Sequence, residues 1–105
     1  MIVKIFRRDE WDSASAAGRF AGSADDARDG FIHFSTADQL SGTLAKHYRG
    51  ETDLVIAEVD EAAFGNSLRW EASRDGKTFP HLYGEWDFTT APPRIVDAPG
   101  IAEGG

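Results

Sequence analysis

The sequence predicts one small α+β domain, with a mostly antiparallel mixed sheet and two main helices, over residues 1–96. Its 105 residues are the size of a single domain, and 41% of them are hydrophobic, enough to form a core. Apolar residues follow helical spacing in two stretches only. The other apolar segments are short, rich in β-branched and aromatic residues, and separated by turn residues.

The first half contains both expected helices. Ile2–Phe6 is a short β-rich run, and we expect Asp9 to cap a helix that ends at Gly18. Residues 19–30 show no clear period and are expected to form a loop with at most one helical turn. A strand is expected over Phe31–Ser35. The second helix should follow a capping box of Thr36 and Gln39 and end at Gly50.

The second half is expected to be mostly β-structure. The unbroken apolar run within Asp53–Asp60 is typical of a strand covered on both faces, so we place it centrally in the sheet. Turn residues divide the chain beyond Asp60 into short strands. Trp86 and Phe88 alternate in one of these strands, and Arg94–Val96 is expected to pair at an edge beyond two prolines. Residues 97–105 are expected to be a flexible tail.

Composition narrows the classes of function. The absence of cysteine excludes disulfides, thiolate nucleophiles and zinc ribbons. The net charge of −7 and the scattered Lys and Arg residues argue against DNA binding and against a long RNA contact. Neither a signal peptide nor a membrane segment is predicted, so we expect a cytoplasmic location. The oligomeric state is not indicated.

Phe31–Ser35 carries the first candidate site residues. In an extended strand His33 and Ser35 lie on one face, roughly 6.6 Å apart, so both could contact one ligand. The expected helix start at Thr36 adds free amide donors that suit an anion. The alternative is structural: His33 is a half-buried histidine bonded to backbone, and Ser35 caps the helix.

Leu68–Glu71 carries the second set. If the segment is extended, Leu68 and Trp70 face the core while Arg69 and Glu71 share the other face. Glu71 could then act as an acid, as a base or as a binder of sugar hydroxyls. The alternative is that Arg69 and Glu71 are ordinary solvated surface charges.

Phe79–Gly84 is the densest cluster. An extended backbone places Phe79, His81 and Tyr83 on one face, which could stack on a flat ligand and hydrogen-bond to it. The alternative is an aromatic core strand whose polar tips reach water or backbone. A metal held by His33, His81 and Glu71 has no support from ligand spacing, and none is expected.

Together the motifs Asp29–Ser35, Leu68–Glu71 and Phe79–Gly84 resemble a bacterial family catalogued as domain of unknown function 952. The resemblance extends from Ile2 to about Val96. It implies a compact relative of the ADP-ribosyltransferase fold, a group that includes NAD-dependent toxins and RNA 2'-phosphotransferases. It further implies that NAD is the candidate cofactor, that His33 grips a ribose, that Tyr83 flanks nicotinamide and that Glu71 supports transfer.

The sequence thus leads to one site with two interpretations. We expect binding of a small, nucleotide-like or NAD-related molecule, with ADP-ribosyl or phosphoryl-group transfer as the candidate chemistry. The alternative is a non-catalytic metabolite-binding or protein-interaction module, so enzyme status stays open. The candidate catalytic residues are His33, His81 and Glu71, and the candidate ligand-binding residues are Ser35, Thr36, Trp70, Phe79 and Tyr83.

Overall fold

The computed structural model describes residues 1–72 and 76–96. In chain order the elements of this part are β1 (Ile2–Arg7), α1 (Arg8–Ala17), β2 (Arg19–Phe20), α2 (Ala24–Asp29), β3 (Ile32–His33), β4 (Ser35–Thr36), α3 (Leu40–His47), β5 (Leu54–Val59), the 3-10 helix η1 (Glu61–Ser67), β6 (Leu68–Ala72), β7 (Thr78–Leu82), β8 (Trp86–Asp87) and β9 (Arg94–Val96). All of the strand pairings are antiparallel. The predicted small α+β domain is confirmed at this level.

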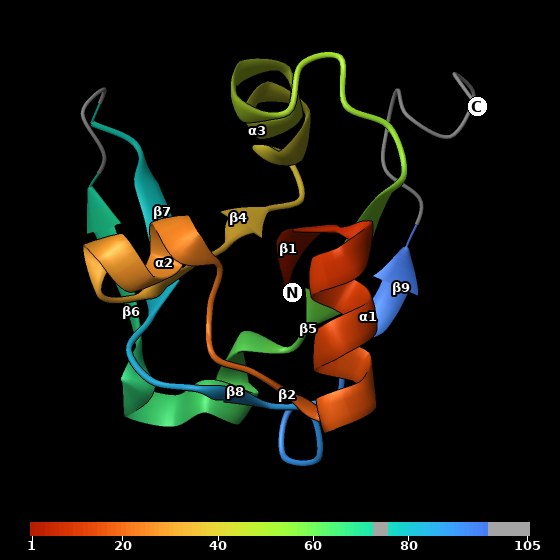
Figure 1. Ribbon diagram of the computed structural model, residues 1–105. Coiled ribbons are helices and arrows are strands. Elements are labelled where there is room, and N and C mark those ends of the chain that lie inside the picture. The colour runs from red at the N-terminus through yellow and green to blue at the C-terminus, as the bar shows by residue number, and fades with distance from the viewer. Residues whose placement is uncertain (73–75, 97–105) are drawn as a thin grey trace.

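A four-stranded sheet in the order β4-β1-β5-β9 forms one half of the fold. Side chains of β1 alternate, so Ile2 and Phe6 enter a core shared with α1, whereas Val3 and Ile5 pack against α3. The two helices therefore cover opposite faces of this sheet, and Figure 1 shows α1 in front of it. The central position expected for β5 and the edge position expected for β9 are both confirmed.

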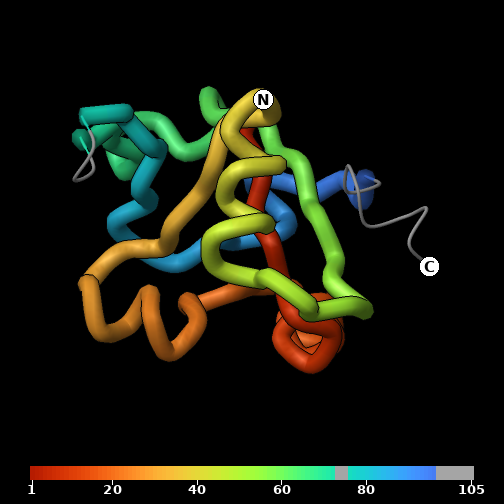
Figure 2. Tube along the Cα trace, turned by 90° about the horizontal axis from the view of Figure 1, so that it is seen from above, coloured from red at the N-terminus to blue at the C-terminus, as the bar shows by residue number. Residues whose placement is uncertain are grey.

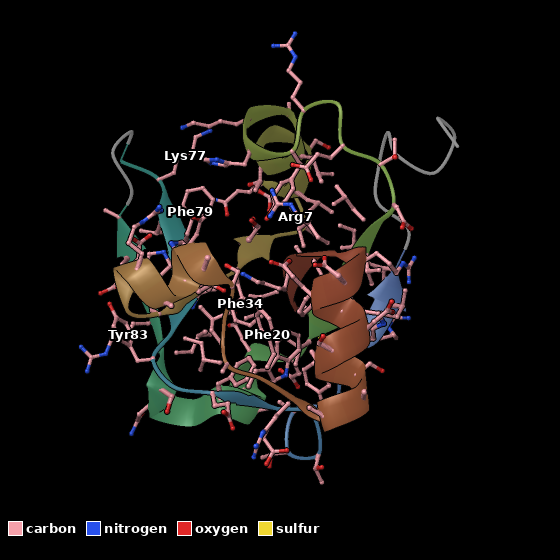
Figure 3. The ribbon with its side chains drawn as sticks, in the orientation of Figure 1. Arg7, Phe20, Phe34, Lys77, Phe79 and Tyr83 are labelled. Atoms are coloured by element: carbon pink, nitrogen blue, oxygen red, sulfur yellow. The ribbon has the colours of Figure 1, made fainter. Side chains whose placement is uncertain are left out.

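A three-stranded sheet in the order β3-β7-β6 forms the other half, and the short pair β2-β8 closes the end between the two halves (Figure 1). The main core lies between the sheets, where Figure 3 shows Phe20 and Phe34 pointing inward. Trp86 is fully buried there and donates from Nε1 to the Ala91 carbonyl at 2.8 Å. The core thus fixes the three-stranded sheet against the rest of the molecule.

The expected strand over Phe31–Ser35 is interrupted. Ile32 and His33 pair with β7, but Ser35 and Thr36 pair with β1 in the other sheet. Phe34 lies at the crossing, where its side chain is buried in the core and its N–H donates to the Pro80 carbonyl at 3.0 Å. Figure 2 shows the chain running from α2 across to the N-terminal end of β1. The prediction of one strand was wrong because core packing of Phe34 turns the chain between sheets.

The loop expected over residues 19–30 is also a misprediction, because it contains β2 and α2. Ser23 caps α2, exchanging hydrogen bonds with Asp26 at 3.2 and 2.9 Å, and Gly30 ends the helix with a left-handed φ of 88°. The helix has six residues, too few for a detectable apolar period. Its fully formed caps and a buried Asp26 stabilise it instead.

The helix ends differ in detail from expectation. Gly18 ends α1 as predicted, but Arg7 rather than Asp9 occupies the N-cap, and its N–H donates to Glu10 at 2.9 Å. Thr36 and Gln39 exchange the two hydrogen bonds of a capping box ahead of α3. α3 itself ends at His47, three residues before Gly50.

Two expectations for the second half need correction. The strand over Trp86 and Phe88 is limited to Trp86–Asp87, because the chain turns at Thr89, whose N–H donates to the Asp87 carboxylate at 2.8 Å. Trp70, expected in the core, is 45% exposed because it lies on β6, the edge strand of its sheet, whereas Pro80 opposite it on β7 is fully buried. The predicted tail over residues 97–105 lies outside the described residues. Within the described residues, no helix is long and apolar enough to cross a membrane.

Candidate functional site

The register of the three-stranded sheet gathers the candidate site on one face. His33 of β3 lies opposite His81 of β7, which lies opposite Arg69 of β6. Since side chains two residues apart share a face, Tyr83 and Glu71 join this row. Figure 3 shows Tyr83 on this side of the molecule, beside α2.

Glu71, His81 and Tyr83 form one hydrogen-bonded group. His81 Nδ1 lies 2.8 Å from Glu71 Oε1, and the Tyr83 hydroxyl donates to the same oxygen at 2.7 Å. The bond from His81, followed by that from Tyr83, lowers the pKa of Glu71, so this side chain is an acceptor at neutral pH. The hydrogen bond from Tyr83 to Glu71 also raises the pKa of the Tyr83 hydroxyl.

This group sets the tautomer of His81. A carboxylate can only accept, so Nδ1 of His81 carries hydrogen toward Glu71. The other nitrogen, Nε2, has no hydrogen-bond partner among residues 1–72 and 76–96. In the neutral ring Nε2 is therefore a lone-pair acceptor, held in place by the Glu71 contact, as a general base requires.

His33 is held by a second carboxylate group on α2. Its Nδ1 lies 2.6 Å from Asp26 Oδ1, and its backbone N–H donates to the same oxygen at 3.2 Å. Asp26 is only 3% exposed and also accepts from Lys4 Nζ at 3.1 Å, a lysine that is itself 6% exposed in the middle of β1. Burial acts to raise the pKa of Asp26, but His33 and Lys4 outweigh it and hold that pKa well below its ordinary range.

The second ring nitrogen of His33 is also engaged. Nε2 lies 3.0 Å from Asp29 Oδ2, at the last residue of α2. The ring therefore has one carboxylate at each nitrogen, and both contacts become ion pairs when the ring is protonated. His33 and His81 thus differ in the contacts of Nε2, although their ring centroids are 5.5 Å apart.

Aromatic rings surround the two histidines. Phe31 stacks on His81 with centroids 4.0 Å apart and lies 5.3 Å from the Tyr83 ring. The Arg69 guanidinium lies over Tyr83 at 5.5 Å, within cation–π range. The site is therefore a patch of rings and charges, rather than a row of isolated surface residues.

Two shallow hollows flank this patch and share Gly84. One, of about 270 Å³, lies beside Asp26, Gly30 and Phe31. The other, of about 240 Å³, has Phe64 and Ala91 among its apolar lining and Tyr83, Glu85 and Asp87 among its polar lining. Within the described residues, no group of three or more His, Asp or Glu is arranged to hold a metal ion.

The remaining candidate residues lie elsewhere or at the margin. Ser35 is buried, and its hydroxyl is 3.2 Å from that of Thr43 in α3. Thr36 is engaged in the turn before α3. Trp70 lies opposite Pro80 on the other face of the hairpin, and Phe79 lies opposite Glu71 on the site face. The fold thus gathers His33, Glu71, Phe79, His81 and Tyr83, and separates Ser35, Thr36 and Trp70 from them.

The chain matches the model of the family described as "Protein of unknown function (DUF952)" over residues 5–91. It belongs to the DUF952 family. The fold is similar to the crystal structure of protein CC0527 from Caulobacter crescentus, with a TM-score of 0.82, 46% identity and coverage of 95% of this chain and 90% of that one. A solution NMR structure of CC0527 gives a TM-score of 0.78, with 46% identity and coverage of 95% and 89%. Among curated proteins, none matches the chain.

The DUF952 match covers every residue of both histidine groups except Lys4, which lies one residue before it. Sequence reasoning had missed Lys4, Asp26 and Asp29 as parts of the site. One signal was available for Lys4, a charged residue at an apolar position of a buried strand, which requires a buried partner. Asp26 carried no comparable signal, because its segment was expected to be a loop.

Proposed function

We propose that this face binds a small nucleotide-like ligand and transfers an ADP-ribosyl or phosphoryl group on it by acid–base catalysis. The observation that carries the proposal is the pair of adjacent histidines, each of which has its Nδ1 held by a carboxylate. In the proposal, the neutral ring of His81 uses Nε2 as the base, and the protonated ring of His33 uses Nε2 as the acid. One base and one acid about a reacting centre are what a direct displacement requires, and each typically contributes about 10²- to 10⁴-fold.

In the proposed step a hydroxyl oxygen attacks phosphorus or the ribosyl carbon and forms the new bond. His81 Nε2 takes the proton of that hydroxyl at the same time. The bond to the leaving group breaks, and the leaving group receives the Nε2 proton of His33. Glu71 and Asp26 act as positioning residues that orient the two rings. No nucleophilic side chain is needed, because the displacement is direct.

The surroundings support a nucleotide-like ligand. Tyr83 and Phe31 offer ring faces on which a base can stack, and Arg69 adds a guanidinium beside them. Each hollow is slightly smaller than the roughly 300–1,000 Å³ of typical ligand pockets, and Gly84 lines both. In this proposal a ligand with two linked parts, such as a base and a sugar phosphate, uses both hollows. An ADP-ribosyltransferase-like fold and NAD as the cofactor belong to the same proposal.

A second candidate is a binding module without turnover. One observation favours it: Oε1 of Glu71 already accepts two hydrogen bonds, and both ring nitrogens of His33 contact carboxylates. Groups that are satisfied in this way hold a rigid recognition surface. Under this interpretation the same residues recognise a metabolite or a protein without changing it.

A thermal-shift screen of NAD, ADP-ribose and nucleoside phosphates tests ligand binding. Saturation at 100 times Kd adds about 2.7 kcal/mol to the free energy of unfolding. For a domain of this size that raises Tm by roughly 10 to 20 °C, at about 4 to 8 °C per kcal/mol. The absence of a shift with every nucleotide would refute the nucleotide site.

Product formation over time then separates enzyme from binder. His81→Ala should lower the rate by about 10²-fold or more, because the positioned base is lost. The matched control is His47→Ala, since His47 is exposed at the end of α3, away from this sheet, and should leave the rate unchanged. Binding without product in the wild type would favour the module.

A further inference from the structure

The two carboxylates on His33 differ in how firmly they are held. Asp26 is buried and accepts from Lys4, from the Ser23 N–H and from the His33 backbone as well as from the ring. Asp29 has its side chain 39% exposed. Asp26 is thus a fixed part of the fold, whereas Asp29 is a surface residue whose carboxylate lies beside His33 Nε2.

Charges alternate along this chain of contacts. When His33 is protonated, Lys4 is positive, Asp26 negative, His33 positive and Asp29 negative. If Asp29 moves away, the three remaining groups carry one net positive charge, which points to solvent at His33 Nε2. That donor requires an acceptor, and the net positive charge favours an anionic acceptor over a neutral one.

The side chain of Asp29 is exposed at the end of α2 and can rotate away from His33 without a change in the backbone. Asp29 ends α2, and the next residue, Gly30, has a φ of 88°, so the chain leaves the helix directly beyond this carboxylate. Arg28 Nε already lies 3.5 Å from Asp29 Oδ1 and can keep the displaced carboxylate paired. A hollow is lined by Gly30 and Phe31, the two residues that follow Asp29 in the chain.

We propose that Asp29 occupies the place of an anionic ligand group, and that a phosphate oxygen of the ligand displaces it from His33 Nε2. This rests on the proposed function and specifies its ligand as one that carries a phosphate. Displacement also turns the Nε2 hydrogen of protonated His33 from Asp29 to the ligand oxygen, so ligand binding and acid activation are coupled at one nitrogen.

The test titrates inorganic phosphate into ¹⁵N-histidine-labelled protein and follows the Nε2 signals of His33 and His81 by NMR. The variants are Asp29→Ala, which removes the competitor, and Asp25→Ala as the matched control. Asp25 is on the same helix, is 70% exposed and pairs with Arg28 at 3.2 Å, but does not contact His33. Asp29→Asn is the second variant and keeps the side-chain shape without its charge.

We expect phosphate to move the His33 Nε2 signal, and to bind Asp29→Ala about fivefold more tightly than wild type, the equivalent of about 1 kcal/mol for an exposed ion pair. Asp29→Asn should also bind phosphate more tightly, and Asp25→Ala should match wild type. Equal affinity in wild type and Asp29→Ala, or a shift at His81 without one at His33, would overturn the proposal.

A further arm separates this inference from the proposed function. Nucleoside monophosphate and NAD are titrated beside inorganic phosphate and adenosine. If the nucleotides bind no more tightly than phosphate, the nucleotide site fails while displacement of Asp29 stands. If they bind more tightly but Asp29→Ala has no effect on any phosphate-bearing ligand, the nucleotide site stands and the displacement fails.

Discussion

Asp26→Asn should be strongly destabilising, although the substitution changes neither the shape nor the size of the side chain. It removes the only buried carboxylate that Lys4 contacts among the described residues, and leaves that ammonium in the core between Ile2 and Phe6. Breaking a buried pair by neutralising one partner costs about 3–5 kcal/mol. The total free energy of unfolding of a small domain is about 5–15 kcal/mol, so this loss is a large fraction of the stability.

The assay is urea unfolding monitored by circular dichroism. The free energies of unfolding of wild type and variant are compared, and the m-value should be the same in both. Thermal unfolding should show a Tm lower by roughly 12 to 40 °C, from about 4 to 8 °C per kcal/mol. The matched control is Asp25→Asn, whose side chain is 70% exposed and whose pair with Arg28 is worth under about 1 kcal/mol.

A double-mutant cycle tests the physical reason. Lys4→Met removes the buried ammonium, so Lys4→Met combined with Asp26→Asn should be more stable than Asp26→Asn alone. A double variant that loses the sum of the two single effects, within about 0.5 kcal/mol, would show that the pair is not coupled and refute the reasoning.

Four further predictions concern glycines and titrating groups. Gly42→Ala should stabilise the protein by about 0.4–1 kcal/mol in urea unfolding, because a Cβ at this position of α3 meets nothing within 4 Å. Gly22→Ala should instead destabilise the protein, because the φ of Gly22 is 114° and an added Cβ would lie 2.9 Å from the Asp26 Cβ. The lowered pKa of Asp26 means that its stabilisation is complete above its ordinary value of 3.8 and is lost as pH falls below it; wild type should lose urea stability between about pH 5 and pH 2 more steeply than Asp26→Asn. The raised pKa of Tyr83 means that its stabilisation is complete below 10.0 and is lost at higher pH; Glu71→Gln should move the ultraviolet titration of Tyr83 to lower pH, and an unmoved titration would contradict the hydrogen bond.

Strand alternation in the sequence was enough to sort much of the site. It assigned His81 and Tyr83 to one face, and Arg69 and Glu71 to one face, because the period of two holds along any extended segment. It could not show that these faces coincide, since that depends on the register between β6 and β7. Nor could it place Trp70, because its burial depends on which strand lies at the edge of the sheet.

The sequence by itself determined the α+β class, the central and edge strands, the Gly18 helix end and the family motifs. Each of these depends on local pattern, on capping or on continuous apolar runs. Only the tertiary structure decided that Phe34 divides its segment between two sheets, and that a short helix brings Asp26 and Asp29 to His33. Those contacts join residues through packing and buried charge, which leave no period in the sequence to detect.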